Sequence, residues 1–148
     1  MRRSPRSGPL PAPDPADPDR TRYASGTPWE PKVGYSRAVR VGSRIYVSGT
    51  TATAPDGSIV GRGDAYAQTV QALENIERAL AALGSRRADI VRLRVYVTDL
   101  GDFDAIARAL GERFAEVRPA NTMVQVSALV DPAMKVEIEA DAELPPPP

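Results

Sequence analysis

The apolar residues of this chain change their spacing along the sequence, and this change constrains the fold more than any other feature. They alternate with polar residues from Val39 to Gly49, around a Gly42-Ser43 turn, which is typical of a β-hairpin. From Asp64 to Gly84 they recur every three or four residues, which is typical of a helix with one buried face. Alternation returns over 88–100, a second helical pattern covers 102–117, and strands are expected over 121–127 and 134–143.

This order predicts one α+β domain in which a mixed β-sheet carries two helices on one face. A Pro-Asp-Gly turn predicts a further short strand around Ile59-Val60. We expect Asp64 to cap the first helix and Asp102 or Asp99 to cap the second. The residues expected to be buried are Tyr66, Val70, Leu73, Ile76 (or Glu77), Leu80 and Leu83 in the first helix, Val91, Leu93, Val95 and Val97 in the following strand, and Phe103, Ile106, Leu110 and Phe114 in the second helix.

The sheet face away from the helices is expected to be semi-polar. Alternation places on it Tyr46, Ser48, Tyr96, Met123 and Gln125. A face of this kind is neither a core nor fully solvated, so it indicates self-association.

Proline marks the ends of the chain, with six prolines in the first 20 residues and four at the C-terminus. The leader lacks the apolar core, roughly 7–15 residues long, of a secretory signal, and it holds too few apolar residues to fold. We expect residues 1–26 to be a disordered leader, residues 27–144 to form the domain and residues 145–148 to be a disordered tail. No apolar run approaches the roughly 20 residues that cross a bilayer, so we expect a cytoplasmic protein without a membrane partner.

The chain has no histidine and no cysteine, and this excludes several kinds of site. A disulfide framework, a thiolate nucleophile, a Cys/His zinc site and a Ser-His-Asp triad are all impossible. Acid–base chemistry would fall to carboxylates, Tyr, Lys, Arg or bound water. Basic and acidic residues balance at 19 each, so no overall field favours nucleic acid. We expect neither a metal nor a cofactor.

Four acids alternate along the last predicted strand: Glu137, Glu139, Asp141 and Glu143. Alternation places them on one face of the sheet, with Val136, Ile138, Ala140 and Ala142 on the core side. From the pattern alone, a solvated acidic face explains each of them better than a functional carboxylate does.

Five segments between about Tyr35 and Ala142 resemble the Rid (YjgF-like, RidA-type) family of reactive-intermediate deaminases, in the family's order and spacing. They are YSRAVRVGSRIYVSGTTA, QTVQALENIERALAALG, DIVRLRVYVTDLGDF, RPANTMVQVSAL and VEIEADA. The resemblance implies a chorismate-mutase-like fold and a homotrimer with a barrel-like core, whose small-molecule clefts lie between subunits. It also implies hydrolysis of enamines or imines to ketoacids and ammonia. Tyr35, Ser48 and Gly49 match positions that line the family cleft, and Glu137 matches the acid that places or activates water.

One position departs from the family. Active deaminases carry an arginine directly after Pro-Ala, which holds the substrate carboxylate by two contacts, and Asn121 stands there. Loss of such a contact costs on the order of 2–4 kcal/mol of binding. Asn121 is expected to bind a loop carbonyl or a neutral ligand group, and Met123 to pack at the interface that holds the ligand. Arg94 is expected to form an interface salt bridge or to supply a displaced anion contact.

Three functions remain open at this stage. The first is hydrolysis of a small enamine, imine or related reactive nitrogen compound, and the second is a non-catalytic trimeric module that binds a metabolite or a partner protein. The third is RNA cleavage, which is the weakest because the domain has no histidine, no basic stripe and no aromatic ladder.

Overall fold

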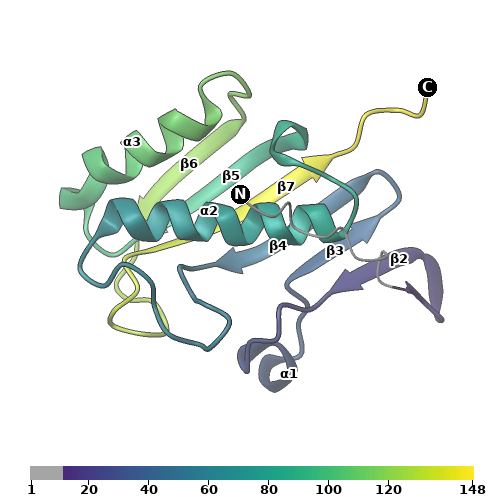
Figure 1. Ribbon diagram of the computed structural model, residues 1–148, viewed down its shortest axis with the longest axis horizontal. Coiled ribbons are helices and arrows are strands. Elements are labelled where there is room, and N and C mark those ends of the chain that lie inside the picture. Colours follow the sequence, from purple (N-terminus) through teal and green to yellow (C-terminus); the bar gives the residue numbers. More distant parts are fainter. Residues whose placement is uncertain (1–11) are drawn as a thin grey trace, which may run out of the picture.

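The computed structural model describes residues 12–148, which form one mixed sheet with helices packed on it (Figure 1). Within these residues there are three α-helices, two of them long, and seven strands. The helices are α1 (Trp29–Val33), α2 (Ala65–Ala82) and α3 (Phe103–Phe114). The strands are β1 (Pro13–Asp14), β2 (Asp17–Tyr23), β3 (Ala38–Val41), β4 (Arg44–Thr50), β5 (Ile90–Val97), β6 (Ala120–Gln125) and β7 (Val136–Glu143).

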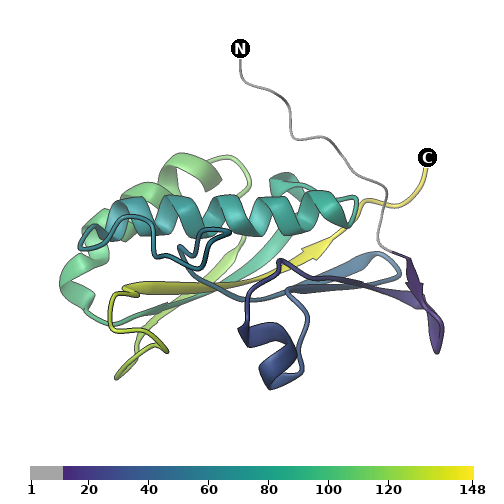
Figure 2. The same ribbon diagram turned by 60° about the horizontal axis from the view of Figure 1, so that its bottom comes forward.

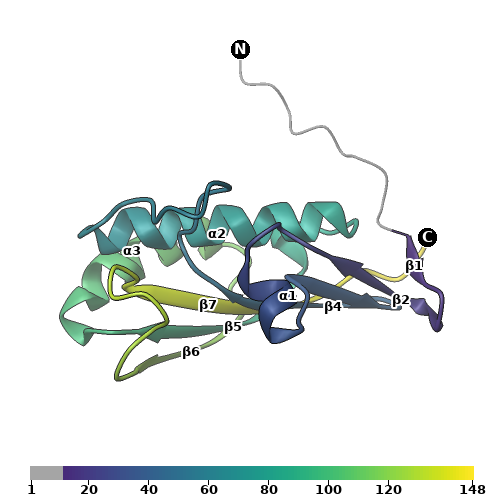
Figure 3. The same ribbon diagram turned by 90° about the horizontal axis from the view of Figure 1, so that it is seen from below.

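The strands follow the order β1-β2-β3-β4-β7-β5-β6 across the sheet. Neighbouring strands are antiparallel except β5 and β6, which are parallel because α3 forms the crossover between them. Figures 2 and 3 show α2 and α3 side by side on one face of the sheet. The prediction of a mixed sheet with two long helices on one face is therefore confirmed; α1, a short additional helix, was not predicted.

Helix α2 begins and ends as its sequence predicts. The Asp64 side chain accepts a hydrogen bond from the backbone N–H of Ala67 at 3.0 Å, and Gly84 follows the last turn at φ +83°. Leu73, Ile76 and Leu80 are buried against the sheet, which makes this helix the main cover of the core.

Several local predictions were wrong for reasons of packing. A bulge between Ile90 and Arg92 shifts the register of β5, so Ile90 is buried and Val91 is 49% exposed. Phe103 also lies outside the core, at 49% exposure. The predicted strand at Ile59-Val60 reduces to a single bridge between Thr53 and Ile59.

The end of the leader is ordered, which contradicts the prediction that all of residues 1–26 are disordered. Strands β1 and β2 extend the sheet beyond β3. The part of β2 that pairs with β3 runs from Arg20 to Tyr23 and contains no proline, so every N–H needed for the ladder is present. Tyr23 also packs against the core. The prediction for residues 1–11 lies outside the described residues.

We now expect deletion of residues 1–22 to lower the melting temperature by several degrees, since it removes β1 and nearly all of β2 and exposes the edge of β3. Deletion of residues 1–11 alone keeps both strands and serves as the control. Equal melting temperatures for the two truncated chains, measured by circular dichroism, would show that β2 contributes nothing to stability.

The face of the sheet away from α2 and α3 differs in part from the prediction. Asn121 and Met123 of β6 pair in parallel with Leu93 and Val95, which are core residues. Met123, and by the same register Gln125, therefore lie on the helix side, and Met123 packs against the core. Tyr46 and Tyr96 do lie on the face of the sheet away from α2 and α3, which we call the open face, as predicted. No helix in residues 12–148 has the length and apolar character needed to cross a membrane.

Candidate functional site

The acids of β7 alternate with its core residues as predicted, but their surroundings differ. Glu139 accepts a hydrogen bond from the Tyr96 hydroxyl at 2.6 Å, and Arg94 binds Asp141 at 3.2 Å and Glu139 at 3.6 Å. Within residues 12–148, Glu137 has neither a side-chain hydrogen bond nor an ion pair, although its side chain is half-buried. Glu137 is therefore the one partly buried acid of this strand that is free to act on a ligand.

Glu137 lies directly over the backbone of Gly49. A Cβ atom added to Gly49 would come within 2.9 Å of the Glu137 Cδ and 3.0 Å of its Oε1. The glycine sits at an irregularity of the β4–β7 ladder, between Val47 and Thr50. The absence of a side chain at Gly49 is thus what allows the carboxylate to approach the strand.

Arg37 joins Gly49 to Tyr35, and the sequence analysis did not include it among the candidate site residues. Its guanidinium donates to the Gly49 carbonyl, to Thr50 Oγ1 at 3.2 Å and to the Tyr35 hydroxyl at 3.1 Å. The same guanidinium lies over the Tyr35 ring, 5.4 Å from its centre. Arg37 is only 7% exposed, which is rare for an arginine, but its burial is visible only in the structure, and no sequence motif singled it out.

Glu30 of α1 provides the counter-charge for Arg37, 3.7 Å away. Burial by itself would raise the pKa of Glu30. Hydrogen bonds from Ser25 and Thr27 and the charge of Arg37 outweigh this effect, so the pKa of Glu30 lies below its usual range. Glu30 therefore remains ionised and keeps the arginine in place.

Ser48 takes part in the site through the backbone. Its hydroxyl donates to the Ser36 carbonyl at 2.7 Å, and its N–H donates to the Arg37 carbonyl at 2.9 Å. These bonds fix the segment that carries Tyr35 and Arg37 against the end of β4. The structure thus brings together four of the predicted site residues, Tyr35, Ser48, Gly49 and Glu137.

The electrostatics of Glu137 suit acid–base chemistry. Burial raises the pKa of its carboxyl above the ordinary value of 4.5, the charge of Arg37 opposes this rise, and Glu139 adds to it. A carboxyl with a raised pKa binds its proton more tightly than an ordinary carboxyl does, and this is the direction that favours a general acid.

The other three predicted ligand residues lie elsewhere in a single chain. Asn121 faces α3, in a shallow hollow that it shares with Leu110 and Phe114, and Met123 is on the same face. Arg94 is on the opposite face, where it binds the acids of β7. Within one chain, Arg94 therefore cannot replace an arginine at position 121.

Substitution of Gly49 by alanine is expected to displace Glu137, because the added methyl group would meet the carboxyl carbon at 2.9 Å. We expect a loss of stability of about 1–3 kcal/mol, as for other overpacked sites. Gly111→Ala in α3 is the matched control, since a Cβ there meets nothing within 4 Å and alanine favours a helix. Urea unfolding that ranks Gly49→Ala as equal to or more stable than Gly111→Ala would contradict this geometry.

A half-buried carboxylate over a glycine backbone, on a mixed α+β fold, is the candidate site of this chain. The family described as Endoribonuclease L-PSP matches residues 26–144. The chain is 44% identical to Rv2704 of Mycobacterium tuberculosis, described as a member of the YjgF/YER057c/UK114 family; that structure has a TM-score of 0.77 and the match spans 84% of this chain and 99% of Rv2704. The chain therefore belongs to the YjgF/Rid family, as the sequence motifs indicated, and its mixed sheet and three helices match that family's structures.

Two further relatives carry names that bear on chemistry. The 3-aminoacrylate deaminase RutC of Acinetobacter baylyi is 35% identical over 119 residues, which are 80% of this chain and 93% of RutC. TdcF of E. coli, solved with bound serine, is 34% identical with a TM-score of 0.68, over 74% of this chain and 87% of TdcF.

Proposed function

We propose that this protein hydrolyses a small enamine or imine to a carbonyl compound and ammonia, with Glu137 as the acid–base group. The observation that carries the proposal is a half-buried carboxyl group that has no partner in the described part of the chain, whose pKa is raised and which lies over the Gly49 backbone. In the proposed reaction Glu137 protonates the enamine carbon or the imine nitrogen, which gives an iminium, and a water molecule adds to the iminium carbon while one of its protons returns to Glu137. Glu137 then protonates the amine nitrogen, the C–N bond breaks as ammonia leaves, and the hydroxyl proton is released as the carbonyl forms. The deaminase name of RutC supports this reaction class.

We further propose that the active cleft is completed by another copy of the chain, in a homotrimer. Asn121 and Glu137 lie on opposite faces of one sheet, so a site that contains both requires two copies. The open face also exposes apolar side chains that a partner copy would cover, such as Tyr46 and Val124. Light scattering tests this: a mass near 15.9 kDa, that of one chain, would remove the shared cleft.

The direct test of function is turnover of 3-aminoacrylate and 2-aminoacrylate, followed as release of ammonia. We expect weak activity, because both substrates carry a carboxylate and Asn121 offers no positive charge to hold it. The lack of a positive charge at Asn121 also favours the second candidate function, a non-catalytic module that binds a metabolite. Ligand binding without ammonia release from any small enamine would favour the module.

Asn121→Arg is expected to raise kcat/KM for 2-aminoacrylate by about 30-fold or more, since it restores a charge-assisted contact to the carboxylate. Asn121→Lys is a useful comparison because it adds charge without the planar fork of arginine. The gain should disappear when Glu137→Ala is added. A gain that survives in the double variant would mean that Glu137 is not the acid–base group.

The word endoribonuclease in the family description raises RNA cleavage, the third function considered from the sequence. The absence of histidine and the balanced charge still argue against it. RNA binding that weakens steeply with salt would support it. The cytoplasmic location stays a prediction.

A further inference from the structure

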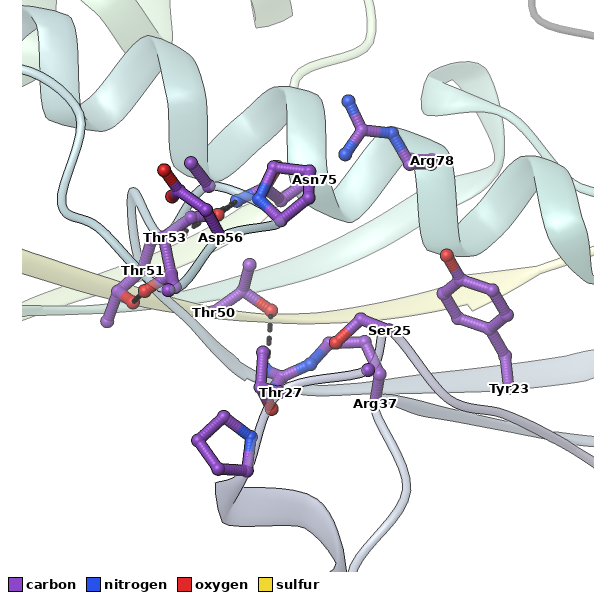
Figure 4. A pocket seen from close by; sticks show the side chains of 15 residues that line it. Tyr23, Ser25, Thr27, Arg37, Thr50, Thr51, Thr53, Asp56, Asn75 and Arg78 are labelled. Carbon is purple, nitrogen blue, oxygen red and sulfur yellow. Dashed lines mark hydrogen bonds between the residues drawn. The ribbon is translucent and has the colours of Figure 1, made fainter.

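A pocket that does not include Glu137, but that shares Arg37 with its surroundings, lies between α2 and the β2–β3 end of the sheet (Figure 4). Its volume is about 410 Å³, which falls in the range of roughly 300–1,000 Å³ common for small-molecule sites. Its walls come from residues 23–28, from the loop 50–57 and from the exposed side of α2, and Arg37 lines it as well. It reaches beyond the family match, because Tyr23 and Ser25 precede residue 26.

Buried or part-buried polar side chains fix the walls of this pocket. The Asn75 side chain of α2 donates to the carbonyls of Thr51 and Thr53, at 3.0 and 2.9 Å, and so holds one wall. On the other wall, the Glu30 carboxylate accepts from the Ser25 N–H at 2.9 Å and from the Thr27 hydroxyl at 2.6 Å. The pocket is therefore preformed, which lowers the entropy cost of binding a ligand.

The lining mixes apolar surface with polar side chains, and its charged groups carry an excess of positive charge. Two arginines, Arg37 and Arg78, and a single carboxylate, Asp56, line the pocket. Arg37 is already balanced by Glu30. Arg78 makes no ion pair within residues 12–148, whereas Arg113, which also faces α2, binds Glu74 and Glu77. Figure 4 shows Arg78 reaching over the pocket from α2, with the Tyr23 hydroxyl below it.

We propose that this pocket binds a small monocarboxylate, held by the Arg78 guanidinium and by the Tyr23 hydroxyl. A guanidinium and hydroxyl donors match one carboxylate group. Asp56 at the same pocket repels a second negative charge, so a monoanion fits better than a phosphate dianion. The contacts proposed here come from Arg78 and Tyr23, which take no part in the proposed deaminase reaction, although Arg37 borders both places. The butyrate-binding test and the ammonia-release test can therefore fail separately.

The full-length chain offers its own probe for the test. Trp29 is its only tryptophan and directly follows Pro28, which lines the pocket. We suggest titrating the chain with sodium butyrate and, as a neutral compound of the same shape, with butyramide. Tryptophan fluorescence and calorimetry would follow binding. The expected result is a roughly millimolar Kd for butyrate and at least tenfold weaker binding of butyramide.

Three variants locate the binding site. Arg78→Gln is expected to weaken butyrate binding at least tenfold, and Tyr23→Phe about threefold, with unchanged melting temperatures because Arg78 is exposed and the Tyr23 ring is kept. Arg62→Gln makes the same charge change at an exposed position outside the pocket, so it should bind butyrate as the wild type does. The proposal is overturned if butyrate does not bind, if butyramide or inorganic phosphate binds as well, or if Arg78→Gln and Arg62→Gln behave alike.

Discussion

Glu137→Gln is expected to lower the rate of ammonia release by about 10²–10⁴-fold, the usual contribution of a general acid–base group. Glutamine keeps the shape of the side chain but can neither give up nor take a proton at this position. Glu143→Gln is the matched control, since it makes the same change on the same strand at an exposed position. We therefore expect the control to retain wild-type kcat and KM.

A stability measurement tests the same residue without any substrate. Because burial raises the pKa of Glu137 above 4.5, the folded chain binds this proton more tightly than the unfolded chain. The stabilisation from that proton is complete below pH 4.5 and is lost as the pH rises through the raised pKa. Glutamine has no such loss, so the melting temperature of Glu137→Gln should exceed that of the wild type at pH 7, and the difference should shrink towards pH 4.

The outcome that contradicts this picture is a wild-type rate in Glu137→Gln, or a difference in melting temperature that does not change with pH. The first would remove Glu137 from the chemistry. The second would mean that its carboxyl is as well solvated in the folded chain as in the unfolded one.

Arg37→Met is expected to cost about 3 kcal/mol of unfolding free energy, because it leaves the buried Glu30 carboxylate without its counter-charge. It also removes the donors to the Gly49 carbonyl and the Tyr35 hydroxyl, so the site should lose activity together with stability. Urea unfolding measures the first effect and the deaminase assay the second.

Two further variants separate the loss of the Arg37–Glu30 ion pair from the other effects of replacing Arg37. Glu30→Gln combined with Arg37→Met removes both charges and should recover part of the lost stability, though not the activity. Arg44→Met changes an exposed arginine of β4 and should stay within about 0.5 kcal/mol of the wild type. A double variant as unstable as Arg37→Met alone would show that the ion pair with Glu30 is not the source of the cost.

The sequence alone determined the elements whose burial repeats regularly. The spacing of three and four predicted α2 with its Asp64 cap, and the spacing of two predicted which residues of β7 face the core. These patterns succeed because a helix or strand buried on one face must place its apolar residues at the period of its backbone. The family motifs singled out Tyr35, Gly49 and Glu137, and in the structure Arg37 binds Tyr35 and Gly49 while Glu137 lies over Gly49. Their part in function stays a prediction.

The tertiary structure alone decided which face of a weakly patterned strand is covered. Strand β6 has only one half-buried residue, Met123, and the rest are exposed, so its own sequence does not say which side meets the helices; its parallel register with β5 does. The bulge at Ile90 moved Val91 out of the core in the same way. The contacts of Arg37 depend on Gly49, which is distant from it in the sequence. The pairing of β2 likewise depends on β3. Contacts of this kind leave no periodic signal, because they arise only when separate segments pack together.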